Sequence, residues 1–136
     1  NIQDHDKSPA YRRGIIHRHA GVVMHGEPTF FEIGVPDPLR AQTFFGRLFD
    51  WKFPPTGEPG QVSITTPTVR GGLHGEDPSS SVTMFFAVED IEASVRLVRE
   101  LGGTAEDARP EEPGFGRFAL CTDDQGVPFG LHRIGG

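Results

Sequence analysis

Three side chains have the type and spacing to do chemistry on one face of a sheet: Glu32, His74 and His132. Glu32 lies in an apolar, strand-like segment, Phe30–Val35 (FFEIGV). Because side chains alternate along a strand, Glu32 shares its face with Phe30 and points away from the face that suits helix packing. A carboxylate in this setting can bind a cation, act as a general base or pair with an arginine.

The two histidines lie on predicted strands near the ends of the two halves of the chain. His74 ends a glycine-rich segment, Val69–His74, and His132 follows Gly130 by two positions on the last predicted strand. Each imidazole could ligate a divalent metal from the same face. Each also has an ordinary alternative, as an exposed or hydrogen-bonded histidine on a strand.

Other candidates are suited to binding an organic ligand. Arg117 has the forked donors that recognise an anion or a carbonyl group, and it could instead pair with Glu32 or form a surface ion pair. Aromatic side chains could wall an apolar pocket or belong to the core. These aromatic candidates are Phe30, Trp51, Phe85 and Phe115.

The elements that position these residues occur twice. Thr29–Phe53 has the pattern of a strand, a capped turn, a helix and the start of a second strand. Val82–Ala105 is a weaker copy, and its alignment without a gap pairs the helix-capping Asp37 with Asp90. Apolar residues at helical spacing follow each cap: Ala41, Phe44, Phe45 and Leu48 in the first copy, and Ile91, Val95 and Val98 in the second.

Shorter strand patterns separated by turn residues follow each helix, so each half is predicted to be β-α-β-β-β. In the first half, Trp51–Phe53 should open a strand that Pro54-Pro55 cuts short. The predicted organisation is an arm at 1–24, either non-native or upstream of a natural start at Met24, and a domain at 25–136. That domain contains module one (27–75), a linker (76–81) and module two (82–134).

Composition limits the partners. The formal charge is −6 over 136 residues, without a basic cluster in the globular part, which argues against nucleic acid and anionic membranes. No apolar run approaches the roughly 20 residues that span a bilayer. A single cysteine, Cys121, excludes an internal disulfide and suits a reducing cytoplasm, which is the predicted location.

Four phrases carry a family resemblance: EIGVPDPLRAQTFFGRLFDW, FFAVEDIEASVRLVRELGG, PGFGRFAL and DDQGVPFGL. Together they resemble the vicinal oxygen chelate superfamily, which includes glyoxalase I, bleomycin-resistance proteins and extradiol dioxygenases. The resemblance covers about Thr29–Arg133 and is greatest to single-chain, two-module glyoxalase-like proteins. It implies an α+β fold in which two βαβββ modules form a curved mixed sheet around a cavity, and it implies a homodimer.

The resemblance also implies where a metal would bind. Metal-dependent members place His, Gln or Glu ligands on the first and last strands of each module, and these hold a divalent ion such as Ni, Mn, Fe or Zn. The corresponding first-strand positions here are Phe30 and Thr83. The last-strand positions are Gly130 and, if the loops of the two modules are aligned at their glycines, His74. Only His74 could coordinate a metal, so an incomplete site and no bound cofactor are expected.

Three functions follow as hypotheses. The first is a metal-free protein that binds a small planar or hydrophobic molecule, in the manner of bleomycin-resistance proteins. The second is a metal-dependent lyase, isomerase or dioxygenase that uses Glu32, His74 or His132 as displaced ligands. The third is a non-catalytic interaction module whose cavity is filled by its own phenylalanines.

Overall fold

The structure is a computed structural model that describes residues 25–135. The predicted arm at 1–24 lies outside the described residues. Within the described part, the chain forms the following elements in order: β1 (Pro28–Gly34), α2 (Pro38–Phe49), β2 (Gln61–Ile64), β3 (Arg70–His74), β4 (Ser81–Ala87), α3 (Ile91–Glu100), β5 (Thr104–Ala105), β6 (Gly116–Thr122) and β7 (Pro128–Ile134).

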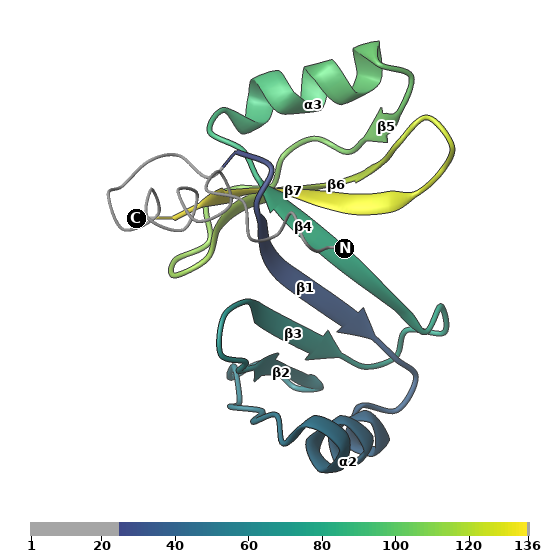
Figure 1. Cartoon of the computed structure of the whole chain (residues 1–136), viewed down its shortest axis with the longest axis vertical. Coiled ribbons are helices and arrows are strands. Elements are labelled where there is room, and N and C mark those ends of the chain that lie inside the picture. The colour runs from purple at the N-terminus through teal and green to yellow at the C-terminus, as the bar shows by residue number, and fades with distance from the viewer. Residues whose placement is uncertain (1–24, 136) are drawn as a thin grey trace, which may run out of the picture.

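The strands form one mixed, curved sheet in the order β2-β3-β1-β4-β7-β6-β5. The first strands of the two modules, β1 and β4, pair antiparallel at its centre. Each of them also pairs in parallel with the last strand of its own module, β3 or β7. Helix α3 lies over the β5–β7 end of the sheet and α2 lies beyond the β2–β3 end (Figure 1). The predicted α+β fold of two related halves is confirmed.

Both helices begin at the predicted aspartate caps. The Asp37 carboxylate accepts a hydrogen bond from the backbone N–H of Arg40, and the Asp90 carboxylate accepts one from Ala93. Pro38 at the first position of α2 has no N–H to leave unsatisfied. These caps confirm the predicted alignment of Asp37 with Asp90 and of the strand–helix units that contain them.

The two helices differ in how they bury their apolar residues. In α3, Ile91 and Val95 are fully covered by the sheet, as predicted. In α2 only Ala41 is buried, whereas Phe44 and Leu48 are 62% and 57% exposed. The predicted stripe on α2 is therefore wrong in part, because the helix packs on the sheet through one flank and leaves the other flank open.

The helix-packing side of the sheet, called here the helix face, carries the two core clusters. The cluster under α2 contains Ile33, Ala41, Ile64 and Leu73, and the cluster under α3 contains Ile91, Val95, Ala119, Cys121 and Leu131. Burial raises the pKa of the Cys121 thiol to about 11, so this cysteine is a neutral core residue at neutral pH. No helix in the described residues is long and apolar enough to cross a bilayer.

Trp51 belongs to the first cluster, where its ring lies against Phe31, Phe45 and Phe49. The strand predicted at 51–53 is present only as an isolated bridge between Lys52 and Thr65. The consecutive prolines that follow carry no N–H with which to extend the ladder.

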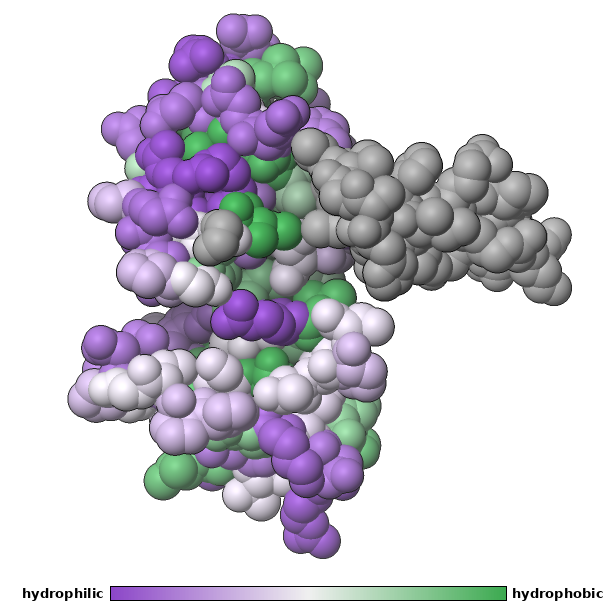
Figure 2. Space-filling view, turned by 90° about the vertical axis from the view of Figure 1, so that its left-hand side faces the viewer, coloured by the Kyte–Doolittle hydropathy of each residue, from purple (hydrophilic) through white to green (hydrophobic). Residues whose placement is uncertain are grey.

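The opposite side of the sheet, called here the open face, carries Phe30, Glu32, His74, Phe85 and His132. Figure 2 shows the side of the molecule that lies on the left in Figure 1. Hydrophilic residues cover much of that surface, and hydrophobic residues are visible near its middle.

Candidate functional site

The strand register fixes which residues of the two modules are equivalent. In module one, Glu32 on β1 lies opposite Gly72 on β3. In module two, Phe85 on β4 lies opposite Gly130 on β7. The alignment that pairs Asp37 with Asp90 also pairs Glu32 with Phe85, so the glycines opposite them, Gly72 and Gly130, are equivalent.

This register corrects the predicted metal positions. The predicted alignment of the last strands is wrong, because the residue equivalent to Gly130 is Gly72 and not His74. The four ligand positions implied by the superfamily are therefore Phe30, Gly72, Thr83 and Gly130, and none of them is a histidine, a glutamine or an acid. Aligning the loops at Gly60 and Gly116 fails because Gly72 follows Gly60 by 12 positions, whereas Gly130 follows Gly116 by 14.

Glu32 and His74 form an acid–imidazole pair on the open face. Glu32 Oε2 lies 2.5 Å from His74 Nδ1, and His74 Nε2 lies 2.9 Å from Asp77 Oδ2. Asp77 Oδ1 accepts hydrogen bonds from the backbone N–H and the hydroxyl of Ser79, at 2.9 and 2.6 Å. The imidazole is thus held between two carboxylates that come from β1 and from the turn after β3.

Protonation of this cluster follows from burial and from its hydrogen bonds. Desolvation raises the pKa of Glu32, although its bond to His74 opposes that shift. Desolvation lowers the pKa of His74, but its bonds to Glu32 and Asp77 outweigh it, so the net shift is upward. The hydrogen bonds from Ser79 hold the pKa of Asp77 below its usual value. The raised pKa of His74 favours the protonated imidazole between the two carboxylates.

Of the two pairings considered for Arg117, the structure shows the ordinary ion pair, with Glu92, and not the pairing with Glu32. Arg117 points to the other side of the sheet, where its guanidinium donates to Glu92 Oε2 at 2.9 Å and to the carbonyl of Arg109 at 2.9 Å. Its neighbour on β6, Phe118, is the residue directed to the open face, where it contacts Phe85. Because side chains alternate along β6, Arg117 and Phe118 lie on opposite faces of the sheet. The sequence alone did not show which of them faces Glu32.

His132 is a structural histidine in this arrangement. It is 5% exposed, and its Nε2–H donates to the carbonyl of Phe115 at 2.8 Å. Its Nδ1 then accepts from the Thr29 hydroxyl at 2.7 Å. Burial lowers the pKa of His132, which favours the neutral ring. Thr29 reaches it because the register of β1 shifts between Pro28 and Phe30.

Aromatic rings contact one another across the centre of the open face. The ring centroid of Phe30 lies 5.6 Å from that of Phe85 and 4.9 Å from that of Phe115, both edge to face. Phe118 extends the group, at 5.8 Å from Phe85 and 5.9 Å from Phe115. Phe85 is buried and the other three are half-buried. We call these four residues the aromatic floor.

The predicted aromatic set is therefore brought together only in part. Phe30, Phe85 and Phe115 lie in the aromatic floor, whereas Trp51 lies in the core under α2. Phe118 was missed, although its position directly after Arg117 on a predicted strand could have shown that these two residues face opposite sides.

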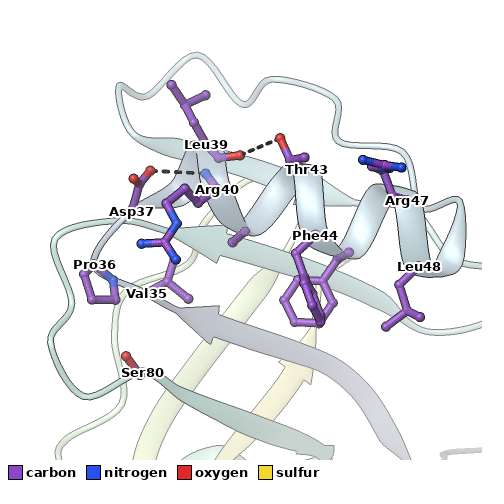
Figure 3. A pocket seen from close by; sticks show the side chains of 12 residues that line it. Val35, Pro36, Asp37, Leu39, Arg40, Thr43, Phe44, Arg47, Leu48 and Ser80 are labelled. Carbon is purple, nitrogen blue, oxygen red and sulfur yellow. Dashed lines mark hydrogen bonds between the residues drawn. The ribbon is translucent and has the colours of Figure 1, made fainter.

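A separate groove runs along α2. It has a volume of about 1160 Å³ and is open to solvent. Phe44 and Leu48 project into it from the helix, and Val35 and Ser80 lie on its other side (Figure 3). No sequence-predicted site residue lines it, and it lies on the exposed flank of α2.

Comparison with known proteins agrees with this architecture. No known family model matches the chain. It is 27% identical over 131 residues to the anthracycline biosynthesis protein DnrV of Streptomyces peucetius, covering 81% of this chain and 48% of DnrV. It is 28% identical over 93 residues to a glyoxylase-like domain-containing protein of Didymella fabae, covering 60% of this chain and 73% of that protein.

The fold also matches a solved structure, an extradiol ring-cleaving dioxygenase from B. fuscum. The TM-score is 0.64 at 16% identity, over 85% of this chain and 35% of the dioxygenase. The fold is thus that of the two-module βαβββ proteins. The glyoxylase-like relative and this fold together support the vicinal oxygen chelate superfamily for the chain. It spans about half the length of DnrV.

Metal-dependent members of this superfamily imply a divalent ion, and the residues found here do not fit one. The four implied ligand positions lack suitable donor atoms. Both ring nitrogens of His74 and of His132 are already hydrogen-bonded. Within residues 25–135, no group of three or more His, Cys, Asp or Glu side chains is arranged to hold a metal ion.

Proposed function

We propose that this protein binds a small planar, hydrophobic molecule on its open face without using a metal. The observation that carries the proposal is the aromatic floor, in which three of the four rings are half-buried and which lies beside the four positions where metal-dependent relatives have ligands. Phe30 itself occupies one of those four positions. Aromatic faces and edges attract a planar ring by offset and edge-to-face contacts, worth roughly 0.5–1.5 kcal/mol per pair beyond area burial.

The name of one relative is compatible with the same class of ligand. DnrV is named as an anthracycline biosynthesis protein, and anthracyclines are planar, fused-ring molecules. We extend only the ligand class to this chain. The rival hypothesis, an interaction module whose open face is filled by its own rings, predicts no such binding.

Ligand titration tests this proposal. 1,8-Dihydroxyanthraquinone and 2-naphthol should each raise the Tm of the protein. Binding of each probe, followed by its absorbance or fluorescence, should saturate. Phe115→Leu should weaken binding, because Phe115 contacts both Phe30 and Phe118 in the floor. Phe44→Leu, the same change in the groove of α2, is the matched control. Absence of binding by the folded wild type would contradict the proposal.

We further propose that a second copy of this chain covers the groove of α2. The exposed apolar residues on α2 are Leu39, Phe44, Leu48 and Phe49. Leu39, Phe44 and Leu48 line the groove, so a second copy that covers it would remove these apolar side chains from water.

The oligomeric state tests the second proposal. Light scattering should give a dimer for the wild type and a monomer for Phe44→Asp, because the substitution introduces a charge into the apolar contact. Val127→Asp changes a residue on the β6–β7 turn that is exposed to a similar degree, and it should remain dimeric. A monomeric wild type, or a dimeric Phe44→Asp, would contradict this assignment.

A further inference from the structure

The Glu32 carboxylate has one oxygen without a hydrogen-bond donor. Oε2 is bonded to His74, whereas Oε1 accepts no hydrogen bond from any residue in the 25–135 range. The side chain is 28% exposed, so solvent or a ligand can reach it from the open face. An acceptor oxygen that has no donor within the described residues is available to a donor from a ligand.

The position of Oε1 connects it to the aromatic floor. A methyl group built at Gly72 would lie 2.5 Å from Oε1 of Glu32 and 3.1 Å from the tip of the Phe30 ring. The carboxylate and the ring therefore both lie over Gly72, and only a glycine leaves room for them. A ligand that lies on the aromatic floor at Phe30 would have its rim beside Oε1.

The other side of the carboxylate is held in place. His74 is fixed between Glu32 and Asp77, and Asp77 is fixed by Ser79. A methyl group at Gly34 would lie 2.7 Å from His74 Nε2, so this part of the cluster also depends on a glycine. Glu32 is thus a pre-oriented acceptor, and binding costs little side-chain ordering.

We infer that Glu32 is the specificity-determining residue of the open face and that it selects planar ligands that carry a phenolic or enolic hydroxyl on the rim. This inference rests on the proposed function, because the ring of the ligand must lie on the aromatic floor for its hydroxyl to reach Glu32. The hydroxyl donates to Oε1, while His74 and Asp77 act as positioning residues. No covalent step and no metal is involved.

A pair of probes that differ by one hydroxyl isolates the contact. The wild type should bind 2-naphthol about tenfold more tightly than naphthalene, because a hydrogen bond to a charged acceptor is worth roughly that ratio. Glu32→Met, which has a similar length and no comparable acceptor, should bring the two Kd values to within about twofold of each other. Glu32→Gln keeps a neutral acceptor and should give an intermediate ratio of the two Kd values. This variant also provides the test if Glu32→Met does not fold. Glu58→Met changes an exposed acid in the same module and should leave the ratio unchanged.

The outcomes separate this inference from the proposed function. Equal affinity of the wild type for both probes, or a ratio that Glu32→Met and Glu32→Gln leave unchanged, overturns the role of Glu32 and leaves planar binding intact. Failure of both probes to bind the folded wild type overturns the proposed function and this inference with it.

Discussion

Gly130→Ala should destabilise the protein because Phe85 occupies the space that a side chain would need. A methyl group built at Gly130 overlaps three atoms of the Phe85 ring. Phe85 is 5% exposed and is packed between Phe30 and Phe118, so the ring cannot move aside freely. Overpacking of this kind costs about 1–3 kcal/mol.

The change in the free energy of unfolding combines this overpacking with an effect on the unfolded chain. Alanine restricts the unfolded chain more than glycine does, which contributes about 0.4–1 kcal/mol in the opposite direction. The expected loss in the free energy of unfolding is therefore about 1–2 kcal/mol, or a fall in Tm of roughly 4–10 °C for a domain of this size. Urea denaturation and a thermal melt measure both quantities.

A double-mutant cycle with Phe85→Leu identifies the cause. The smaller leucine should leave room for the added methyl group, so the double variant should be more stable than the sum of the two single changes predicts, by about 1 kcal/mol. Gly46→Ala is the matched control, because a methyl group there lies 3.5 Å from Phe53 and α2 gains up to about 1 kcal/mol of helix propensity. A Gly130→Ala variant as stable as the wild type, or additive effects in the cycle, would refute this reasoning.

The remaining predictions concern three polar contacts. The pKa of His74 is raised in the folded protein, so its contribution to stability is present below its unfolded value of about 6.5 and is lost as pH rises through the folded pKa. His74→Asn should therefore cost more stability at pH 6 than at pH 9, and NMR titration should place the pKa of His132 below 6.5. Thr29→Val should cost about 1–3 kcal/mol in urea denaturation, because it leaves the buried Nδ1 of His132 without a donor. Glu92→Gln should change stability by at most about 1 kcal/mol, because its ion pair with Arg117 is largely exposed on the Glu92 side; a larger loss would mean that this pair is more than a surface contact.

Local sequence signals predicted the parts of the fold that depend on neighbours in the chain. The caps at Asp37 and Asp90 and the buried positions of α3 follow from helix chemistry and periodicity, and both were confirmed. The alternation that directs Glu32 away from the core was also visible in the sequence. Phe44 and Leu48 show the limit, because periodicity identifies an apolar flank and does not say what covers it.

The site depends on contacts that local signals do not encode. Glu32 meets His74 only because β1 pairs in parallel with β3 after a long crossover through α2 and β2, and one wrong alignment obscured that relationship. Arg117 does not reach Glu32 because its position on β6 directs it to the helix face. Gly72 and Gly130 lie under the Glu32 and Phe85 side chains, so these two glycines mark the equivalent positions of β3 and β7.

NMR can locate a ligand bound to the open face. The protein contains eleven phenylalanines, and NMR of samples with labelled phenylalanine rings can follow each during titration with 2-naphthol. The floor residues are Phe30, Phe85, Phe115 and Phe118. Binding on the aromatic floor should give saturable shifts at these four rings and leave the signals from the phenylalanines of α2 unchanged. Shifts confined to the α2 phenylalanines, or none at all, would contradict it.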